Sequence, residues 1–468
     1  METHISAVFI GTDTVFKLRK AIRLAFVDFT PLAERERTAR SELALNTPNA
    51  PGLYRDVVPV IRAADGTLAL DGTGEVVDWV VRMARVPAGD FLDELATHGE
   101  LTPALLDAMA DAVAALHARN TVVPSDQANA LRRVADGNAL AAREAGLDQT
   151  EIAAWLSAIV AQLDRHEAAL RARGAAGYVR RAHGDLHLAN MCLWQGKPVA
   201  FDALEFNEDL ATIDIGYDLA FLLMDLDVRV DRAAANRLMN RYFARTGDWA
   251  LVAFLPVWLS MRAMIRAHVA ATRGRTAESR RYFDRALDYL RLAPPCVVAV
   301  GGLPGSGKST VARALAPALG PAPGAVILRS DEIRKRHFGV APEQRLPKSA
   351  YSRAPSRAVF AEIAAATATI TDAGHAVVAD ATFMAPVHRT SLAAATGTVP
   401  FLGTWLDVPM AELERRVAVR TGDASDADLG VLRSAARAGT GAGSWLKLDG
   451  TDTASAVAAI RATLAIRL

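Results

Sequence analysis

One segment of the sequence has the residue types and spacing that phosphoryl transfer requires. It reads HGDLHLAN over residues 183–190, and an apolar stretch separates it from Asp202. Asp185 and Asn190 stand in the order D-x-x-x-x-N of a phosphoryl-transfer loop. A carboxylate such as Asp185 can orient an acceptor hydroxyl and take its proton, whereas Asn190 and Asp202 can hold Mg²⁺ against nucleotide phosphates. The structural alternative is a loop whose histidine and aspartate only satisfy local hydrogen bonds.

A second segment, GLPGSGKS over residues 302–309, fits the phosphate-binding pattern G-x-x-x-x-G-K-[ST]. It follows the strand-like run VVAV and precedes the helix-like run TVARALAPAL, which is the context that the pattern requires. The glycines let backbone N–H groups turn inward around phosphate oxygens, and the positive end of the next helix faces the same oxygens. Lys308 can reach the β- and γ-phosphates, and the Ser309 hydroxyl can bind Mg²⁺. We therefore predict nucleotide binding by Gly302, Gly305, Ser306, Gly307, Lys308, Ser309 and Thr310.

Five charged residues later in the chain could complete a second phosphoryl-transfer site. Asp331 could accept the proton of an acceptor hydroxyl, and Arg334 could hold the substrate or a phosphate. Asp380 ends an apolar run, where a carboxylate can assist Mg²⁺. Arg416 and Arg420 are four residues apart on a predicted helix, so that both could close over a triphosphate. For Asp331, the alternative is a helix start that the preceding serine caps. For Asp380, it is an acid at a strand end without a role. For Arg416 and Arg420, it is a solvated basic face.

Hydrophobic spacing places these motifs in two kinds of domain. Residues 1–90 contain strand-like runs around a helix-like stretch over 31–46, and apolar residues recur at helical spacing from about residue 101. Pro103 follows Thr102 at a predicted helix start. After Pro294-Pro295, short apolar runs alternate with Ala-rich helix-like stretches, which predicts a parallel sheet. We therefore predict an α+β domain over 1–293 and an α/β domain over 294–468.

Composition limits the classes of protein that the chain can represent. Its 468 residues carry 53 basic and 52 acidic side chains, a net charge of +1 that disfavours nucleic acid as a partner. The two cysteines exclude a disulfide framework and are typical of a reducing cytoplasm. The amino terminus lacks the pattern of a secretory signal. The longest apolar run, near Trp249–Met261, predicts a buried helix, so we expect a cytoplasmic protein with no membrane partner.

The segment over 183–190 resembles the catalytic loop of the aminoglycoside phosphotransferase and choline-kinase-like family, which is related to protein kinases. The resemblance implies a bilobal, protein-kinase-like first domain in which Asp185 is the base and Asn190 and Asp202 bind Mg²⁺. Asp202 stands where protein kinases carry D-F-G, but the sequence here is Asp-Ala-Leu. Asp214 and Asp218 match a family segment that usually supports the site structurally.

The same resemblance implies a strand lysine that binds phosphates and is paired with a helix glutamate. Lys17 and Glu42 fit these roles, and Lys20 is the rival of Lys17. No Gly-rich loop precedes these strands, and EVVDWVVRM is the expected strand leading to the hinge between lobes. Glu205, with the acids at 208 and 209, could attract a cationic substrate, but a solvated loop is the commoner outcome.

Residues 296–468 resemble small P-loop kinases such as gluconate kinase, the zeta-toxin-like kinases and polynucleotide 5′-kinases. The whole chain is similar to bifunctional aminoglycoside phosphotransferase/ATP-binding proteins. This implies an enzyme that uses ATP and Mg²⁺ at two sites, each phosphorylating a hydroxyl of a small molecule, sugar-like or cationic. The alternatives are one catalytic site with a nucleotide-binding regulatory domain, and a zeta-toxin-like or polynucleotide-kinase-like activity of the P-loop domain.

Overall fold

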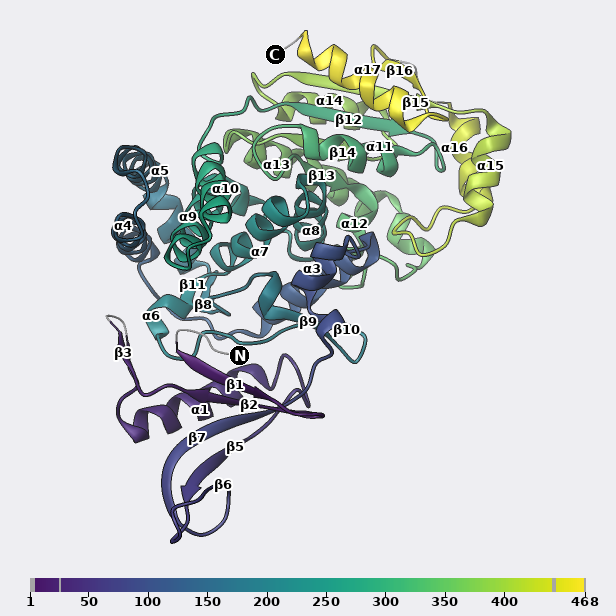
Figure 1. Cartoon of the computed structure of the whole chain (residues 1–468). Helices are drawn as coiled ribbons and strands as arrows, with labels where there is room; N and C mark the ends of the chain where they lie inside the picture. Colours follow the sequence, from purple (N-terminus) through teal and green to yellow (C-terminus); the bar gives the residue numbers. More distant parts are fainter. Residues whose placement is uncertain (1–4, 25–26, 440–442, 467–468) are drawn as a thin grey trace. The chain divides into compact units, whose positions relative to one another are not determined.

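The computed structural model describes residues 5–24, 27–439 and 443–466 (Figure 1). By its contacts the chain divides into two compact units. The first unit comprises Met1–Val230 and Ile265–Arg275, and the second comprises Asp231–Met264 and Thr276–Leu468. One of the points of division lies within helix α9 (Leu255–Thr272).

The first unit begins with an antiparallel sheet whose strands run in the order β1-β2-β7-β5-β6. The strands are β1 (Ser6–Ile10), β2 (Thr14–Arg19), β5 (Tyr54–Arg62), β6 (Leu68–Leu70) and β7 (Glu75–Ala84). Lys17 lies inside the sheet, because β2 pairs it with Val8 on one side and Val81 on the other. Helix α1 (Leu32–Asn46) packs on β5 and β7. The strands and the helix predicted for this region are therefore confirmed.

The rest of the first unit is mainly helical. Its other elements are β3 (Arg23–Leu24), β4 (Val27–Asp28), η1 (Ala88–Asp90), α2 (Leu92–His98), α3 (Pro103–Arg119), α4 (Gln127–Glu144), α5 (Gln149–Ala175), β8 (Val179–Arg181), η2 (Leu188–Asn190), β9 (Met191–Trp194), β10 (Lys197–Ala200), α6 (Glu208–Ala211), β11 (Thr212–Asp214) and α7 (Ile215–Arg229). Helix α3 begins as predicted, since the Leu105 N–H donates to the Thr102 side chain at 3.2 Å.

The second unit contains a five-stranded sheet in the order β13-β14-β12-β15-β16, in which neighbouring strands are parallel. The strands are β12 (Val297–Gly302), β13 (Val326–Arg329), β14 (Val377–Asp380), β15 (Phe401–Asp407) and β16 (Leu446–Asp449). The short apolar runs VVAV, AVILR, AVVAD and GTWLDV of the sequence form β12 to β15. The predicted parallel sheet is therefore confirmed.

Some of the helices of the second unit contact the strands of this sheet and bury its apolar residues. The helical elements are α8 (Arg232–Thr246), η3 (Trp249–Phe254), α9, α10 (Thr276–Asp288), α11 (Lys308–Leu315), η4 (Ala316–Ala318), α12 (Ser330–His337), η5 (Lys348–Tyr351), α13 (Arg353–Asp372), α14 (Pro386–Ala395), α15 (Met410–Val419), α16 (Leu429–Ala438) and α17 (Thr453–Ala465). Val298 and Val300 of β12 share one buried cluster with Leu315 of α11 and Ile460 of α17. This packing holds the residues after β12 at the carboxyl end of the sheet, where ligands bind in open α/β folds.

Helix α8 lies along strand β13, at the edge of the sheet. Asn236 and Asn240 are one helical turn apart, and their Nδ2 atoms donate to the Ala325 carbonyl at 3.0 and 3.2 Å. The Oδ1 of Asn240 accepts from the Ile327 N–H at 2.6 Å. These amides satisfy backbone groups that a neighbouring strand would otherwise pair. Residues 231–264 therefore belong by contact to the second unit, although they precede the predicted boundary at 294.

The stretch Trp249–Thr272 is long and apolar enough, by length and composition alone, to cross a membrane. Val257, Trp258, Leu259 and Met261 within it are buried in the protein. Core helices of globular proteins pass the same test, and the burial agrees with the buried helix predicted here.

Candidate active sites

The predicted catalytic loop of the first unit brings Asp185 and Asn190 into direct contact. The Asn190 Nδ2 donates to the carbonyl oxygen and to the Oδ2 of Asp185, both at 2.9 Å. The Nε2 of His187 lies 3.5 Å from the same Oδ2. Asp185 nevertheless keeps 41% of its side chain exposed. It is therefore an oriented carboxylate that a hydroxyl compound can reach.

Buried hydrogen bonds from α7 and α3 hold this loop in place. The N–H groups of His183 and Gly184 donate to the two carboxylate oxygens of Asp218, at 3.0 and 2.9 Å. His117 contacts the same carboxylate at 3.3 Å. Gly184 has φ +85°, and a Cβ there would lie 3.0 Å from the Leu204 Cβ, so glycine is required. Asp218 thus supports the loop, as the resemblance implied.

His183 connects the loop to the strand end that carries Asp202. Its Nε2 lies 2.9 Å from the Phe201 carbonyl, and its Nδ1 accepts from the Asp185 N–H at 3.3 Å. A neutral ring with the proton on Nε2 satisfies both contacts. Burial lowers the pKa of His183, which favours that neutral form.

Lys17 contacts both Glu42 and Asp202. Its Nζ donates to Glu42 Oε1 at 2.7 Å and also to Asp202 Oδ1. Burial lowers the pKa of Lys17, but the charges of Asp202 and Glu42 outweigh burial and raise it above the usual lysine value. Asp202 has φ +61°, and its N–H donates to the Tyr54 hydroxyl at 3.0 Å. Between the two candidate lysines, the structure places Lys17 at the site carboxylates, while Lys20 follows the end of β2.

Glu205 corrects an expectation from the sequence. It is 3% exposed rather than solvated, and it forms an ion pair with the buried Arg19, which also reaches Glu42 at 3.1 Å. Burial and the charge of Glu42 raise the pKa of Glu205 to about 7. Alternation along β2 places Arg19 on the face of Lys17, and this signal could have identified Arg19. Nothing in the local sequence indicated that Glu205 would be its partner.

The small sheet lacks one feature of a kinase lobe within the described residues. Only β1 precedes the strand of Lys17, and the hairpin between them turns through Gly11-Thr12-Asp13. A Gly-rich hairpin ahead of the lysine strand is therefore not present in the part of the chain that the structure describes, in agreement with the sequence.

In the second unit, the predicted phosphate-binding loop connects β12 to α11. Gly302, Gly305 and Gly307 have φ values of +151°, +83° and +89°. A Cβ on Gly302 would lie 2.5 Å from the Ser306 Oγ, so the loop is too tight there for a side chain. Helix α11 begins at Lys308, which places Ser309 and Thr310 in its first turn. The loop thus has the strand, turn and helix that phosphate binding requires.

The loop lies beside the carboxylate predicted to assist a metal ion. The Ser309 Oγ donates to Asp380 Oδ2 at 2.6 Å, and Asp380 is the last residue of β14. The Lys308 Nζ donates to the Leu303 carbonyl at 2.9 Å. Burial lowers the pKa of Lys308, and the charges of Asp380 and Asp331 only partly offset this shift. The structure therefore brings Lys308, Ser309, Asp380 and Asp331 together.

Arg329 is a site residue that the sequence analysis did not single out. It is buried at the end of β13, with its Nε 3.5 Å from Asp380 Oδ2 and its Nη2 2.6 Å from Asp423 Oδ1. The available signal was a charged residue at the carboxyl end of a buried strand, two residues before Asp331.

Asp331 and Arg334 both lie on α12. Burial raises the pKa of Asp331 despite the nearby charge of Arg329. Arg334 is 6% exposed and donates from Nη1 to the Ala350 carbonyl at 2.7 Å. The expected serine cap is wrong in detail, because Ser330 is the first residue of the helix and Arg329 is its N-cap.

The prediction that Arg416 and Arg420 share a helical face is wrong. Helix α15 ends at Val419, and Arg420 has the extended angles φ −70° and ψ 126°. Its Nη2 donates to the Ala427 carbonyl at 2.6 Å. Arg416 remains on the helix and donates from Nη1 to the Gly450 carbonyl at 3.0 Å and the Gly305 carbonyl at 3.5 Å.

The predicted metal ligands are suited to Mg²⁺ and not to a softer ion. Asn190 with Asp202, and Ser309 with Asp380, offer amide, hydroxyl and carboxylate oxygens. Within the described ranges, no group of three or more His, Cys, Asp or Glu side chains is placed to hold a metal by itself. Mg²⁺ commonly binds through one or two carboxylates together with substrate phosphates and water, so these pairs fit the ion.

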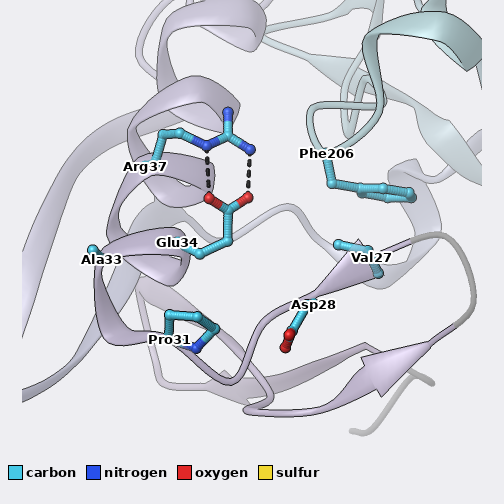
Figure 2. A pocket seen from close by; sticks show the side chains of 7 residues that line it. All are labelled: Val27, Asp28, Pro31, Ala33, Glu34, Arg37 and Phe206. Carbon is cyan, nitrogen blue, oxygen red and sulfur yellow. Dashed lines mark hydrogen bonds and ion pairs between the residues drawn. The ribbon is translucent and has the colours of Figure 1, made fainter.

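A cavity of about 610 Å³ lies elsewhere in the first unit. It is lined by Val27, Asp28, Pro31, Ala33, Glu34, Arg37 and Phe206. Figure 2 shows the ion pair of Glu34 and Arg37 on one side and Phe206 beside Val27 on the other. None of the predicted site residues lines it.

Comparison with known proteins places the chain in a family. The model described as the phosphotransferase enzyme family matches residues 12–255, more than half of the chain. The chain belongs to the phosphotransferase enzyme family. A second model, described as an AAA domain, matches residues 297–439. This phosphotransferase is therefore a kinase with an alcohol group as acceptor, and its kinase-like domain is followed by a P-loop domain with a parallel sheet, as predicted.

Relatives of this phosphotransferase occur in mycobacteria. An uncharacterized protein of Mycobacterium tuberculosis (strain ATCC 25618 / H37Rv) is 29% identical over 406 residues, which cover 83% of this chain and 79% of that protein. An uncharacterized protein of Mycobacterium bovis matches with the same identity and coverage.

Solved structures similar to this phosphotransferase include two kinases and an aminoglycoside phosphotransferase. A gluconokinase from Sinorhizobium meliloti is 22% identical, covering 38% of this chain and 99% of its own, with a TM-score of 0.26. A choline kinase from Cryptosporidium parvum is 11% identical, covering 59% and 80%, with a TM-score of 0.36. An aminoglycoside phosphotransferase is 13% identical, covering 62% and 91%, with a TM-score of 0.40.

Proposed function

We propose that the chain is an ATP- and Mg²⁺-dependent phosphotransferase with two phosphoryl-transfer sites, each acting on a hydroxyl of a small molecule. One observation supports the proposal: in each unit a lysine suited to phosphate lies within electrostatic reach of a carboxylate suited to the metal. In the first unit these are Lys17 and Asp202, and in the second they are Lys308 and Asp380. We place the enzyme in the cytoplasm, with ATP and small hydroxyl compounds as its partners.

In the first site, Asp185 would be the base that accepts the proton of the acceptor hydroxyl. Asn190 and Asp202 would hold the metal, and Lys17, kept in position by Glu42, would exchange its contact with Asp202 for nucleotide phosphates. Mg²⁺, when bound, neutralises phosphate charge and orients the transferred group. Val8 and Val15 share the Lys17 face of the sheet, so this apolar face is where the adenine would lie.

In the second site, the loop from Gly302 to Thr310 would surround the nucleotide phosphates. Lys308 would bind the β- and γ-phosphates, and Ser309 with Asp380 would hold the metal. Asp331 would act as the base, and its raised pKa brings it closer to neutrality, where a base works best. Arg334 would hold the acceptor. Arg416 and Arg420, although not on one face, would supply positive charge near the phosphates.

A second candidate function is one catalytic site with a regulatory nucleotide site in the other domain. The observation that favours it is the missing Gly-rich hairpin, because that hairpin covers the phosphates in protein kinases. Under this alternative the first unit would bind nucleotide without turning it over.

The experiment that tests the proposal compares Asp185→Asn, Lys308→Ala and the double variant. Each full-length protein is incubated with Mg²⁺, γ-labelled ATP and a cell metabolite extract, and phosphorylated products are separated. Two active sites predict that each single variant loses a different set of products and the double variant loses both. If Asp185→Asn changes nothing, the regulatory alternative holds. If the double variant retains every product, the proposal is wrong. Asp136→Asn and Lys447→Ala, both at exposed positions, are the matched controls.

A further inference from the structure

Arg19 is a buried cation of the first unit that has no part in the reaction proposed above. It lies two residues after Lys17 on β2, and its side chain is only 6% exposed. Burying a guanidinium is unfavourable unless carboxylates or other acceptors surround it. The partners of Arg19 therefore show which groups of the first site it serves.

The Arg19 guanidinium bridges three separate segments of the first unit. Its Nη1 donates to the Ser6 Oγ of β1 at 2.9 Å, and its Nη2 donates to Glu42 Oε2 on α1 at 3.1 Å. The same Nη2 forms an ion pair with Glu205, in the loop between β10 and α6. The Phe29 ring lies 5.3 Å from the guanidinium carbon. A planar guanidinium with this many fixed partners has little freedom to move.

Lys17 and Arg19 share the carboxylate of Glu42 but are held differently. Lys17 binds Oε1 at 2.7 Å, and Arg19 binds Oε2. The second carboxylate of Lys17 is that of Asp202, which is 38% exposed and which a metal ion can therefore reach. The second carboxylate of Arg19 is that of Glu205, which is only 3% exposed. Of the two cations, the lysine is thus the one with a partner that a ligand can replace.

This difference matters when a nucleotide binds, since Lys17 must leave Asp202 for the phosphates. Glu42 and Glu205 then remain buried, and their charges still attract Lys17. Within the described residues, Arg19 is the only other cation that contacts Glu42. Without Arg19, the attraction of Lys17 to these carboxylates would oppose its transfer to a phosphate. Arg19 balances the carboxylates in place of Lys17 and leaves the lysine charge available.

We propose that Arg19 is a positioning residue of the first phosphate site and that Glu205 is the group that fixes it. The ion pair of Arg19 and Glu205 keeps Glu42 oriented towards Lys17, and it holds β2 to the loop that carries Asp202. Lys17 is the cation that moves to the phosphates, whereas Arg19 stays with the carboxylates. The inference rests on the proposed function of the first site, and it gives the buried pair an effect on nucleotide binding that acts through Lys17.

Binding of Mg²⁺–ATP by the full chain tests the proposal. Every protein carries Lys308→Ala, so that the second site is weakened equally, and the ATP binding that Asp202→Ala removes is assigned to the first site. The pair variant combines Arg19→Gln with Glu205→Gln. Removing both charges together leaves neither side chain as an unpaired buried ion. Dissociation constants come from calorimetry, and thermal unfolding checks that each variant is folded.

A comparison with Lys17→Ala separates positioning from a general effect on the fold. The pair variant should bind ATP about tenfold more weakly or worse, which is the loss expected for one charged hydrogen bond. Because the pair acts through Lys17, adding it to Lys17→Ala should weaken binding no further. Equal binding by the pair variant and its parent would overturn the inference. So would a further loss in the combined variant as large as the loss in the pair variant alone.

Two further variants complete the experiment. Arg82→Gln combined with Asp56→Asn removes an exposed ion pair of the same sheet, with 2.7 Å from Arg82 Nε to Asp56 Oδ1, and should leave ATP binding unchanged. Arg19→Lys keeps the charge but lacks the planar fork, so it should bind ATP more weakly than the parent and more tightly than the pair variant. If the pair variant does not unfold cooperatively, Arg19→Lys, alone and with Lys17→Ala, decides by the same two comparisons.

The outcomes also separate this inference from its basis. If the Lys308→Ala parent shows no ATP binding that depends on Asp202, the proposed function of the first site fails, and the inference fails with it. If that binding is present and the pair variant keeps it in full, the inference alone fails.

Discussion

The side-chain oxygen of Asn240 accepts a hydrogen bond from the backbone N–H of Ile327, 2.6 Å away and 87 residues later in the chain. Ile327 belongs to β13, the edge strand that ends at Arg329, just before the proposed base Asp331. Helix α8 thus occupies the place of a neighbouring strand. The second unit includes residues that precede Pro294-Pro295, and this bears on where the chain can be divided.

We predict that Asn240→Leu destabilises the second unit by about 1–3 kcal/mol, because it leaves the half-buried Ile327 N–H without an acceptor. Chemical denaturation of the full chain measures the effect. Gln149→Leu, which alters an exposed amide of α5, should change stability little. Equal stabilities of the two variants would show that the edge contact contributes nothing.

The position of the boundary can be tested with fragments. The sequence predicts that 1–293 and 294–468 fold separately, whereas the contacts of α8 predict that 294–468 alone exposes the β13 edge and self-associates. The comparison is between 294–468 and 231–468, by thermal unfolding and sedimentation. Cooperative unfolding of monomeric 294–468 would support the boundary at 294 and contradict the role of α8.

Asp185→Asn and Asp202→Ala should fail in different ways. Asp185→Asn should bind Mg²⁺–ATP almost normally but transfer phosphoryl groups about 10²–10⁴-fold more slowly, since it lacks the general base. Asp202→Ala should weaken metal-dependent nucleotide binding itself. Nucleotide titrations with and without Mg²⁺, on the full chain carrying Lys308→Ala to silence the other site, measure both. Normal Mg²⁺–ATP binding by Asp202→Ala would remove Asp202 as a metal ligand.

Lys308→Ala should reduce ATP turnover by the second unit by orders of magnitude, because it removes the positive charge at the β- and γ-phosphates. The measurement is ATP binding and turnover in the Asp185→Asn background, so that only the second site contributes. Lys447→Ala, which removes an exposed lysine of β16, serves as the control. Unchanged binding and turnover would contradict the assignment of the loop.

His375 should make the second unit sensitive to acid. Burial lowers the pKa of His375 to about 4, whereas an unfolded histidine titrates near 6.5. As pH falls, the unfolded state therefore binds the proton at a higher pH than the folded state does. This contribution to stability is fully present above pH 6.5 and is lost as pH falls toward 4. The free energy of unfolding decreases by at most about 1.4 kcal/mol per pH unit.

Unfolding midpoints between pH 7 and pH 4.5 measure this dependence. His375→Leu removes the titrating ring and should flatten the curve, while His98→Gln, at an exposed position, should retain the wild-type slope. Parallel curves for His375→Leu and the wild type would show that His375 does not titrate as a buried neutral ring.

Several residues of both sites could be found from the sequence because their signals are local. The loop over 302–309 needs glycines at positive φ followed by a helix start, and both requirements are readable within eight residues. The spacing from Asp185 to Asn190 likewise placed both residues in one loop, and the structure adds a hydrogen bond of 2.9 Å between their side chains. Lys17 and Glu42 are 25 residues apart, and the resemblance to the kinase family implied their pairing; in the structure the Lys17 Nζ donates to Glu42 Oε1 at 2.7 Å.

The sequence by itself determined the two phosphate-binding motifs, the strands and helices that carry them, and the parallel direction of the strands in the second sheet. It could do so because propensity, periodicity and turn chemistry act over short distances. Only the tertiary structure decided that Glu205 is buried against Arg19 and that Arg329 lies between Asp380 and Asp423. It also decided that Arg420 lies beyond the end of its helix and that α8 forms hydrogen bonds with β13. These partners are between 51 and 186 residues apart, or depend on where a helix ends. Burial and charge pairing are set by which surfaces meet in the folded chain, and no local pattern specifies that.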